Sequence, residues 1–204
     1  MQLQSAIKSN PKLKKFVHWL LIPRGQARPR LWVRLFVNPF IYKRGKNTTI
    51  RYNTRMDLFP FNAFEIGSNC IVEDFATINN GVGDVLIGDN TGVGLNNVII
   101  GPVQIGNFVM LAQNIVISGL NHGYDDVTVA PRKQKVITKQ ITINDNVWIG
   151  ANCVITAGVN IGKQAVIGAG SVVTKDIPAF CVAVGNPARV IKKYNFDTNS
   201  WQKA

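Results

Sequence analysis

His122 is the residue of this chain whose type and setting best suit proton-transfer chemistry. An imidazole takes up and releases a proton near neutral pH, so it can act as a general base toward a hydroxyl group. Asp125 and Asp126 can orient that imidazole or hold hydroxyl groups, and an Asx turn at the start of a loop explains them equally well. Tyr124 can stack on a ligand ring or anchor the loop. A lone His in a loop is also often an ordinary surface residue, so the surrounding elements determine which interpretation of His122 is favoured.

Metal chemistry has little support in the sequence. A zinc site of three imidazoles needs three His, and the chain has only His18 and His122, so we expect no metal. Cys70, Cys153 and Cys181 are widely spaced, with no CxxC pair. Neither a metal site nor a disulfide framework is indicated, and a reducing cytoplasm is the expected compartment. We also expect no signal peptide and no membrane-spanning segment.

A six-residue repeat of aliphatic residues organises most of the chain. The repeat has an early set, out of phase by three residues, and two longer blocks: Ile66, Val72, Ile78; Ile87, Val93, Ile99, Ile105, Leu111, Ile117; Ile143, Ile149, Ile155, Ile161, Ile167, Val173. This period fits neither an α-helix nor a simple strand. It suits a short strand plus a turn, stacked as the sides of a coil with each aliphatic residue inward. The sequence therefore predicts an all-β fold, a parallel β-helix, over a sandwich of short strands.

The domain organisation follows from the repeat and the charge. Residues 1–56 contain 13 Lys and Arg and no acidic residue, whereas the rest has 10 basic and 11 acidic residues. We expect a basic, helical extension over 1–56, a β-helix over 57–194 with a projecting loop at 123–141, and a tail at 195–204. A short helix starting near Arg189 is expected to cap the stack.

The extension itself predicts two helices. Asn10 and Pro11 are typical of an N-cap and a first helical position, and the first helix should end before Pro23. A second helix should start near Pro29. Both mix aromatic, aliphatic and basic residues, as helices on an anionic membrane surface do. Packing against the first coils, with solvated cations, explains the same pattern.

Three segments of the C-terminal half carry a family resemblance. They read ITINDNVWIGAN from Ile141, IGAGSVVTKDIP from Ile167 and VGNPARVI from Val184. They closely resemble hexapeptide-repeat acetyltransferases of the galactoside and maltose type. The run HGYDD from His122 and the later Gln134 are more similar to the branch that acetylates cell-surface polysaccharides, such as colanic acid acetyltransferases. The resemblance spans roughly residues 66–193.

The resemblance implies a left-handed coil, a homotrimer, and acetyl-CoA bound in a groove between neighbouring β-helices. His122 then matches the catalytic base. The family's cofactor-binding positions fall on residues that line the pantetheine arm or approach the nucleotide: Gly150, Ala151, Ala169 and Gly170, then Thr174, Lys175, Arg189 and Lys192. Corner geometry alone also explains the glycines and alanines. Asn97, with Asn96, is an approximate counterpart of an acceptor-binding Asn, and Trp148 is expected either to wall the acceptor site or to belong to the core.

The implied function is O-acetyl transfer from acetyl-CoA to a sugar or glycan hydroxyl, in the cytoplasm and near the inner face of the membrane. The alternative is a non-catalytic β-helix protein that docks on an anionic membrane or nucleic acid through its basic N-terminus. The sequence has no convincing nucleic-acid motif with interleaved stacking aromatics, so we expect no nucleic-acid partner.

Overall fold

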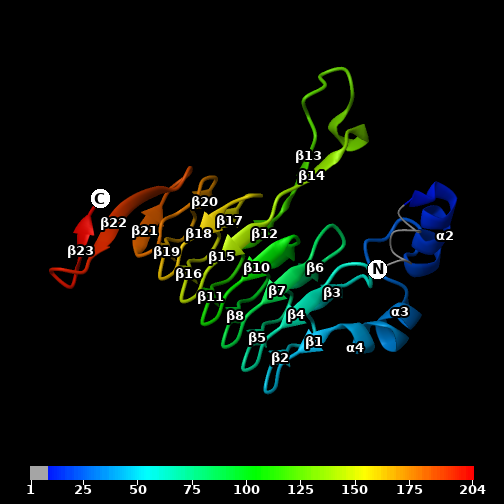
Figure 1. Cartoon of the computed structure of the whole chain (residues 1–204), viewed down its shortest axis with the longest axis horizontal. Helices are drawn as coiled ribbons and strands as arrows, with labels where there is room; N and C mark the ends of the chain where they lie inside the picture. The colour runs from blue at the N-terminus through cyan, green and yellow to red at the C-terminus, as the bar shows by residue number, and fades with distance from the viewer. Residues whose placement is uncertain (1–8) are drawn as a thin grey trace.

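A three-sided parallel β-helix forms the body of the protein (Figure 1). The structure is a computed structural model and describes residues 9–204. Residues 1–8, which include Lys8 of the basic segment, lie outside the described part. Each turn of the coil passes through sheets A, B and C in that order, and equivalent strands of successive turns pair in parallel. The predicted β-helix is confirmed.

The three sheets share the same construction from very short strands. Sheet A contains β1 (Lys43–Arg44), β4 (Phe64–Ile66), β7 (Val85–Ile87), β10 (Val103–Ile105), β15 (Ile141–Ile143) and β18 (Asn160–Ile161). Sheet B contains β2 (Thr49–Ile50), β5 (Ile71–Val72), β8 (Gly92–Val93), β11 (Met110–Leu111), β16 (Trp148–Ile149), β19 (Val166–Ile167) and β21 (Cys181–Val184), followed by β22 (Arg189–Asn195) and β23 (Ser200–Lys203). Sheet C contains β3 (Arg55–Asp57), β6 (Thr77–Asn79), β9 (Val98–Ile100), β12 (Val116–Ser118), β17 (Val154–Ile155) and β20 (Val172–Val173).

The core is one apolar column that runs through the stack. All fifteen aliphatic positions of the six-residue repeat are buried in it. The phase shift between the first set and the second lies in the corner after β6, where residues 80–84 add a longer turn before β7. Burial of this column supplies the main stabilisation, since each coil alone could not bury its inward face.

Glycine and asparagine serve different purposes at the corners. A Cβ on Gly67 would lie 2.7 Å from the backbone nitrogen of Asp89 in the next coil, so close stacking of corners excludes a side chain there. Asn69 instead adopts a positive φ of 57°, which its short polar side chain tolerates. At this corner Gly67 permits close stacking and Asn69 permits the positive φ.

The β-helix begins and ends differently from the sequence prediction. Its first coil starts at Lys43, inside the expected extension of residues 1–56, because Arg44 occupies the position in register with Ile66 and breaks the aliphatic period there. The expected terminal helix near Arg189 is wrong: β22 pairs antiparallel with β21, and β23 pairs antiparallel with β22 through the expected tail. An aromatic cluster holds this hairpin: Phe180, Tyr194, Phe196 and Trp201.

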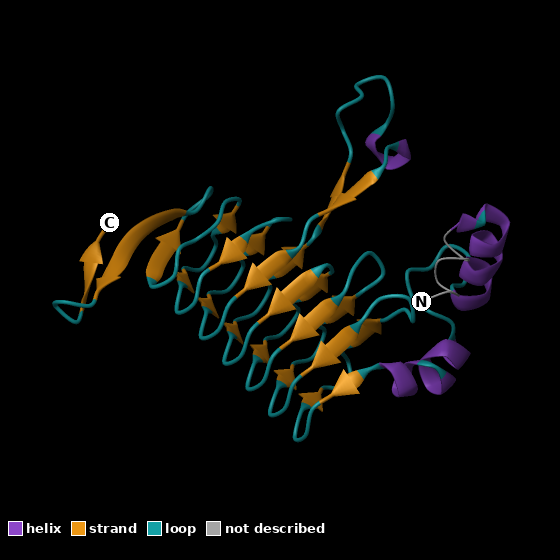
Figure 2. Ribbon diagram, viewed as in Figure 1, coloured by secondary structure: helices purple, strands orange, loops and turns teal. Residues whose placement is uncertain are grey.

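Within residues 9–204, three helices lie at the end of the β-helix where the chain starts (Figure 2). They are α2 (Pro11–Leu21), α3 (Leu31–Phe36) and α4 (Asn38–Ile41). The Asn10 side chain accepts hydrogen bonds from the backbone N–H groups of Lys12 and Leu13, which confirms the predicted N-cap.

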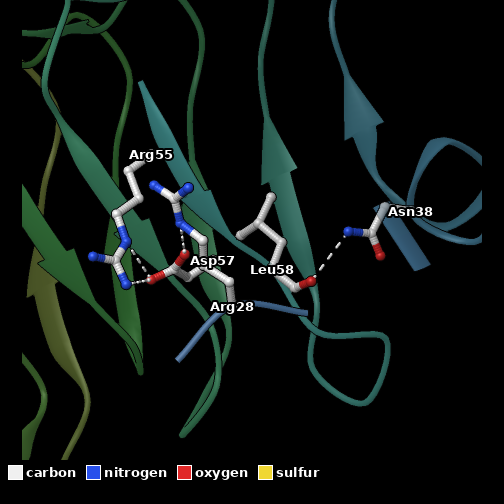
Figure 3. A network of polar contacts seen from close by, with 5 residues as sticks. All are labelled: Arg28, Asn38, Arg55, Asp57 and Leu58. Atoms are coloured by element: carbon white, nitrogen blue, oxygen red, sulfur yellow. Dashed lines mark hydrogen bonds and ion pairs between the residues drawn. The ribbon is translucent and has the colours of Figure 1, made fainter. Parts of the chain in front are cut away.

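Polar contacts tie these helices to the first coil (Figure 3). The buried Asp57 carboxylate of β3 pairs with Arg55 at 2.7 Å and with Arg28, from the segment between α2 and α3, at 3.3 Å. Asn38 donates from Nδ2 to the carbonyl oxygen of Leu58 at 3.1 Å. The extension is therefore anchored on the β-helix and not freely linked to it.

Candidate active site

A two-stranded arm projects from the β-helix between sheets C and A of the fourth coil (Figure 1). It consists of β13 (Leu120–His122), a loop with a 3-10 turn at Pro131–Lys133, and β14 (Val136–Thr138), paired antiparallel with β13. The sequence placed the loop at 123–141, with His122 ending a coil. In the structure the coil ends at Ser118 and His122 already belongs to the arm, because antiparallel pairing extends the base of the insertion.

His122 lies opposite Val136 at the outer end of the β13–β14 pair. Its side chain is exposed, and it makes no hydrogen bond to any residue of the described 9–204. Both ring nitrogens are therefore free to form a hydrogen bond with a bound molecule.

The loop beyond His122 is organised by Gln134. The Nε2 of Gln134 donates to the carbonyl oxygens of Asp126 at 2.8 Å and Val129 at 2.7 Å. The Asp126 carboxylate accepts from the backbone N–H and the hydroxyl of Thr128, and these bonds lower the pKa of Asp126. Asp126 thus forms the Asx-type turn that the sequence offered as one of its two readings.

Asp125 and Tyr124 remain available at the arm. Both are exposed, and no hydrogen bond or ring contact holds either side chain within the described residues. The structure brings them into the same loop as His122 without fixing what they contact.

A corner of small residues runs along the stack between sheets B and C. Gly150 and Ala151 follow β16, and Ala169 and Gly170 follow β19 one coil later. The two corners are in direct contact, since the Gly170 N–H donates to the Ala151 carbonyl oxygen at 2.8 Å. The backbone N–H groups of Ala151 and Ala169 find no acceptor among the described residues. This corner therefore offers backbone donors beside small side chains.

Cationic residues lie above this corner and on the neighbouring one. Arg189 of β22 pairs with Val184 of β21, and β21 pairs with β19, so Arg189 stands two layers beyond the corner of Ala169 along the stack. Lys192 lies further along β22, opposite Val182. Thr174 and Lys175 follow β20 and lie at the corner between sheets C and A, the same corner from which the arm leaves. The sequence predicted that all four residues contact the same cofactor. In the structure Thr174 and Lys175 lie at one corner, and Arg189 and Lys192 lie on β22.

Asn97 has a structural position. It is fully buried, its Nδ2 donates to the carbonyl oxygen of Ala112 at 2.8 Å, and its Oδ1 accepts from the Ile115 N–H at 2.7 Å. With both polar atoms used inside the coil, we no longer propose Asn97 for the acceptor.

The outer faces of the three sheets differ in polarity. In-register outward positions of sheet A are largely polar: Glu65, Leu86, Gln104, Thr142 and Asn160. Those of sheet B include Met110, Trp148, Val166 and Val182, and those of sheet C include Val98, Val116, Val154 and Val172. Trp148 is 48% exposed, so it is not part of the core. Sheets B and C thus carry apolar surfaces that sheet A lacks.

Within the described residues, no group of three or more His, Cys, Asp or Glu could hold a metal ion, and no helix has the length and apolarity to cross a bilayer.

Comparison with known proteins identifies the family. The model of the hexapeptide repeat of succinyl-transferase matches residues 140–175. A galactoside O-acetyltransferase of Lactococcus lactis is 33% identical over 195 residues, which cover 91% of this chain and 90% of the relative. This chain belongs to the hexapeptide-repeat acetyltransferase family.

Two further relatives extend the comparison. The putative lipopolysaccharide biosynthesis O-acetyl transferase WbbJ of Escherichia coli is 33% identical to this acetyltransferase over 167 residues, 78% of this chain and 76% of the relative. The solved N-acyltransferase AntD of Bacillus cereus, in complex with coenzyme A and a nucleotide sugar, shares the fold with a TM-score of 0.67 at 21% identity, covering 81% of this chain and 91% of its own. The β-helix of about six turns matches the left-handed fold of the family. The non-catalytic alternative is set aside, because the acetyltransferase family is one of enzymes.

Sequence reasoning missed two features of this acetyltransferase. Gln134 was noted only for resemblance, and its loop-bracing contacts depend on the folded arm. The apolar outward rows left a readable signal, since an apolar residue directly precedes the inward one at Met110–Leu111, Val154–Ile155 and Val172–Val173.

Proposed function

We propose that this acetyltransferase transfers an acetyl group from acetyl-CoA to a hydroxyl of a sugar or glycan intermediate, with His122 as general base. The observation that carries the proposal is an exposed imidazole on a projecting arm, with no partner among the described residues to occupy it. His122 takes the proton of the acceptor hydroxyl as its oxygen attacks the thioester carbonyl. The C–S bond then breaks, and the departing thiolate of CoA receives the proton.

The donor is proposed to lie along the corner between sheets B and C. The free N–H groups of Ala151 and Ala169 suit the amide carbonyls of the pantetheine arm. Arg189 lies beyond that corner toward the C-terminal end, and Lys192 lies further along β22 opposite Val182, where their charges suit the phosphates of the nucleotide. Thr174 and Lys175 lie on the corner from which the arm leaves, so in this proposal they approach the nucleotide from the neighbouring subunit, as His122 does.

The site is proposed to be completed between subunits of a homotrimer. On one chain, sheet C separates the corner that bears the arm from the corner of Ala151 and Ala169, and the arm points away from the body (Figure 1). A closed ring of three subunits places each chain beside two others through two different surfaces. The arm of one subunit then reaches the donor corner of its neighbour.

The acceptor is proposed to be a glycan intermediate, and the enzyme to work in the cytoplasm. AntD was solved with a bound nucleotide sugar, and the two relatives are named a galactoside O-acetyltransferase and a putative lipopolysaccharide biosynthesis O-acetyl transferase. Tyr124 and Asp125, exposed on the arm beside His122, and Trp148 are proposed to contact the acceptor.

Replacing His122 tests the proposal. We expect His122→Ala to lower kcat/KM for acetyl transfer to a sugar acceptor by about 10²–10⁴-fold, the usual contribution of a positioned base. Release of CoA thiol measures turnover, and the increase in Tm with acetyl-CoA measures donor binding, which should be unchanged. All three cysteines are buried, and burial raises the pKa of the Cys153 and Cys181 thiols, so the folded protein should contribute little to a thiol assay.

Asn121→Ala is the matched control, since Asn121 is exposed on the same strand of the arm. It should retain wild-type turnover. A His122→Ala protein that keeps turnover within about threefold of wild type would remove His122 from the role of base.

A further inference from the structure

One side of α2 is an exposed apolar surface of the N-terminal extension. No residue of α2 is buried. Leu13, Phe16 and Leu20 recur at helical spacing on one side, and Phe16 and Trp19 remain 56% and 62% exposed with their rings 5.9 Å apart. Lys12 and Lys15 border these side chains and are exposed.

The opposite side of α2 faces the β-helix. The His18 ring stacks on Phe61, which follows the first coil, with 5.9 Å between ring centroids. Leu20 is two residues further along the helix and therefore points about 160° away from His18, because each residue turns the helix by roughly 100°. The apolar side is thus directed outward from the protein.

Contacts from the next segment fix this orientation. The Arg30 guanidinium donates to the Trp19 carbonyl oxygen at 3.0 Å, and the Arg30 N–H donates to the Leu21 carbonyl oxygen at 2.8 Å. Arg28, from the same segment, pairs with the buried Asp57 of the first coil (Figure 3). The outward side of α2 is therefore presented by a docked helix.

The positive charge around α2 is largely uncompensated. Residues 9–56 carry no Asp or Glu. The ion pairs of the described residues engage Arg28, Lys43, Arg51 and Arg55. The remaining cations of α2 to α3 have no ion-pair partner in residues 9–204: Lys12, Lys14, Lys15, Arg24, Arg30 and Arg34. An exposed apolar side bordered by cations without an ion-pair partner is complementary to a negatively charged, partly apolar surface.

We propose that α2 docks on the surface of an anionic lipid bilayer. Leu13, Phe16, Trp19 and Leu20 enter the boundary between headgroups and acyl chains, and Lys12 and Lys15 contact lipid phosphates. Self-association through the same side would place these lysines against their own copies without a counter-charge. The centre of the side is aliphatic and aromatic, which does not match a phosphodiester backbone. The inference is independent of the proposed acetyl transfer.

Vesicle binding by the full chain tests the proposal. Wild type should co-sediment with vesicles of phosphatidylcholine containing a quarter phosphatidylglycerol, should bind pure phosphatidylcholine much more weakly, and should be released by salt. Lys12→Gln with Lys15→Gln should weaken binding by about 25-fold, since each lysine near the surface contributes about fivefold. Phe16→Ala with Trp19→Ala should weaken binding by at least about tenfold through loss of apolar insertion.

The matched control is Tyr52→Ser with Lys163→Gln. Both residues are exposed and lie in turns of the β-helix outside α2, and neither makes an ion pair among the described residues, so vesicle binding should be unchanged. All variants should keep wild-type turnover with a water-soluble acceptor.

Three results would overturn the proposal. The first is wild-type binding that is absent, or equal on neutral and anionic vesicles. The second is a smaller assembly, by light scattering, for Phe16→Ala with Trp19→Ala, which would show that this side joins copies of the chain. The third is binding to a single-stranded polynucleotide without binding to the anionic vesicles.

Discussion

At Asn97 one amide joins two successive coils of the β-helix. Its replacement by alanine leaves the Ile115 N–H and the Ala112 carbonyl oxygen buried without partners. We expect Asn97→Ala to lower the free energy of unfolding by about 2–4 kcal/mol. This corresponds to a decrease in Tm of roughly 5–15 °C for a chain of this size, measurable by thermal melts followed by circular dichroism.

Gln104→Ala is the comparison for that measurement, because Gln104 is an exposed amide on the outer face of sheet A. Its Tm should change by less than about 2 °C. Equal effects of the two substitutions would show that the buried amide is not a special link between coils.

The inward aliphatic residues could be predicted one by one, whereas Asn97 could not be placed. The six-residue repeat predicts which residues point inward, because every coil packs its aliphatic residues into the same core. Asn97 directly precedes an outward position. An asparagine side chain there could bind a ligand or form hydrogen bonds between the corners of successive coils. Only the position of the next coil, with Ala112 and Ile115 at hydrogen-bond distance, separates the two roles.

The arm is the element on which the proposed chemistry depends, and Gln134 braces its loop. We expect Gln134→Ala to lower kcat/KM by about tenfold, because a poorly placed imidazole and acceptor lose part of the benefit of fixed orientation. The free energy of unfolding should change by less than about 1 kcal/mol, since the arm lies outside the core column. Steady-state kinetics and a denaturant melt together measure the two effects.

Gln140→Ala serves as the control, because Gln140 is exposed beyond β14 and bonds only the side chain of Gln104. Donor binding, followed by the increase in Tm with acetyl-CoA, should be unaffected in both variants. A Gln134→Ala protein with wild-type kinetics would show that the ordered loop is not needed to position the reacting groups.

The boundaries of elements were the least predictable feature of the fold. A polar insertion after Ile117 predicted a loop, yet the pairing of Leu120 with Thr138 and of His122 with Val136 converts its base into a ribbon. The segment after Arg189 has short-range features of a helix, and β21 offers it an open sheet edge instead. Pairing with a distant strand overrides local preference in both places.

The whole molecule separates its charge and its apolar surface along the stack. The helices at one end carry the free cations, the arm leaves from the fourth coil, and the corner of Ala151 and Ala169 lies in the fifth and sixth coils toward the other end. Sheets B and C are apolar outside, and sheet A is polar. A single chain therefore has both proposed parts of the site without placing them on the same corner, which favours completion by a neighbour.

Co-expression of two inactive variants tests this arrangement. His122→Ala removes the base but keeps the donor corner, and Ala169→Trp fills the donor corner but keeps the base. If each site takes His122 from one subunit and the corner from the next, random mixing in equal amounts restores about a quarter of wild-type activity, since two independent choices must both be correct. If one chain supplied both parts, every site would carry one of the two lesions and the mixture would be as inactive as its components. The restored fraction of about a quarter depends only on how the subunits share the sites and not on the acceptor. The experiment therefore discriminates between the two arrangements even with a poor sugar substrate.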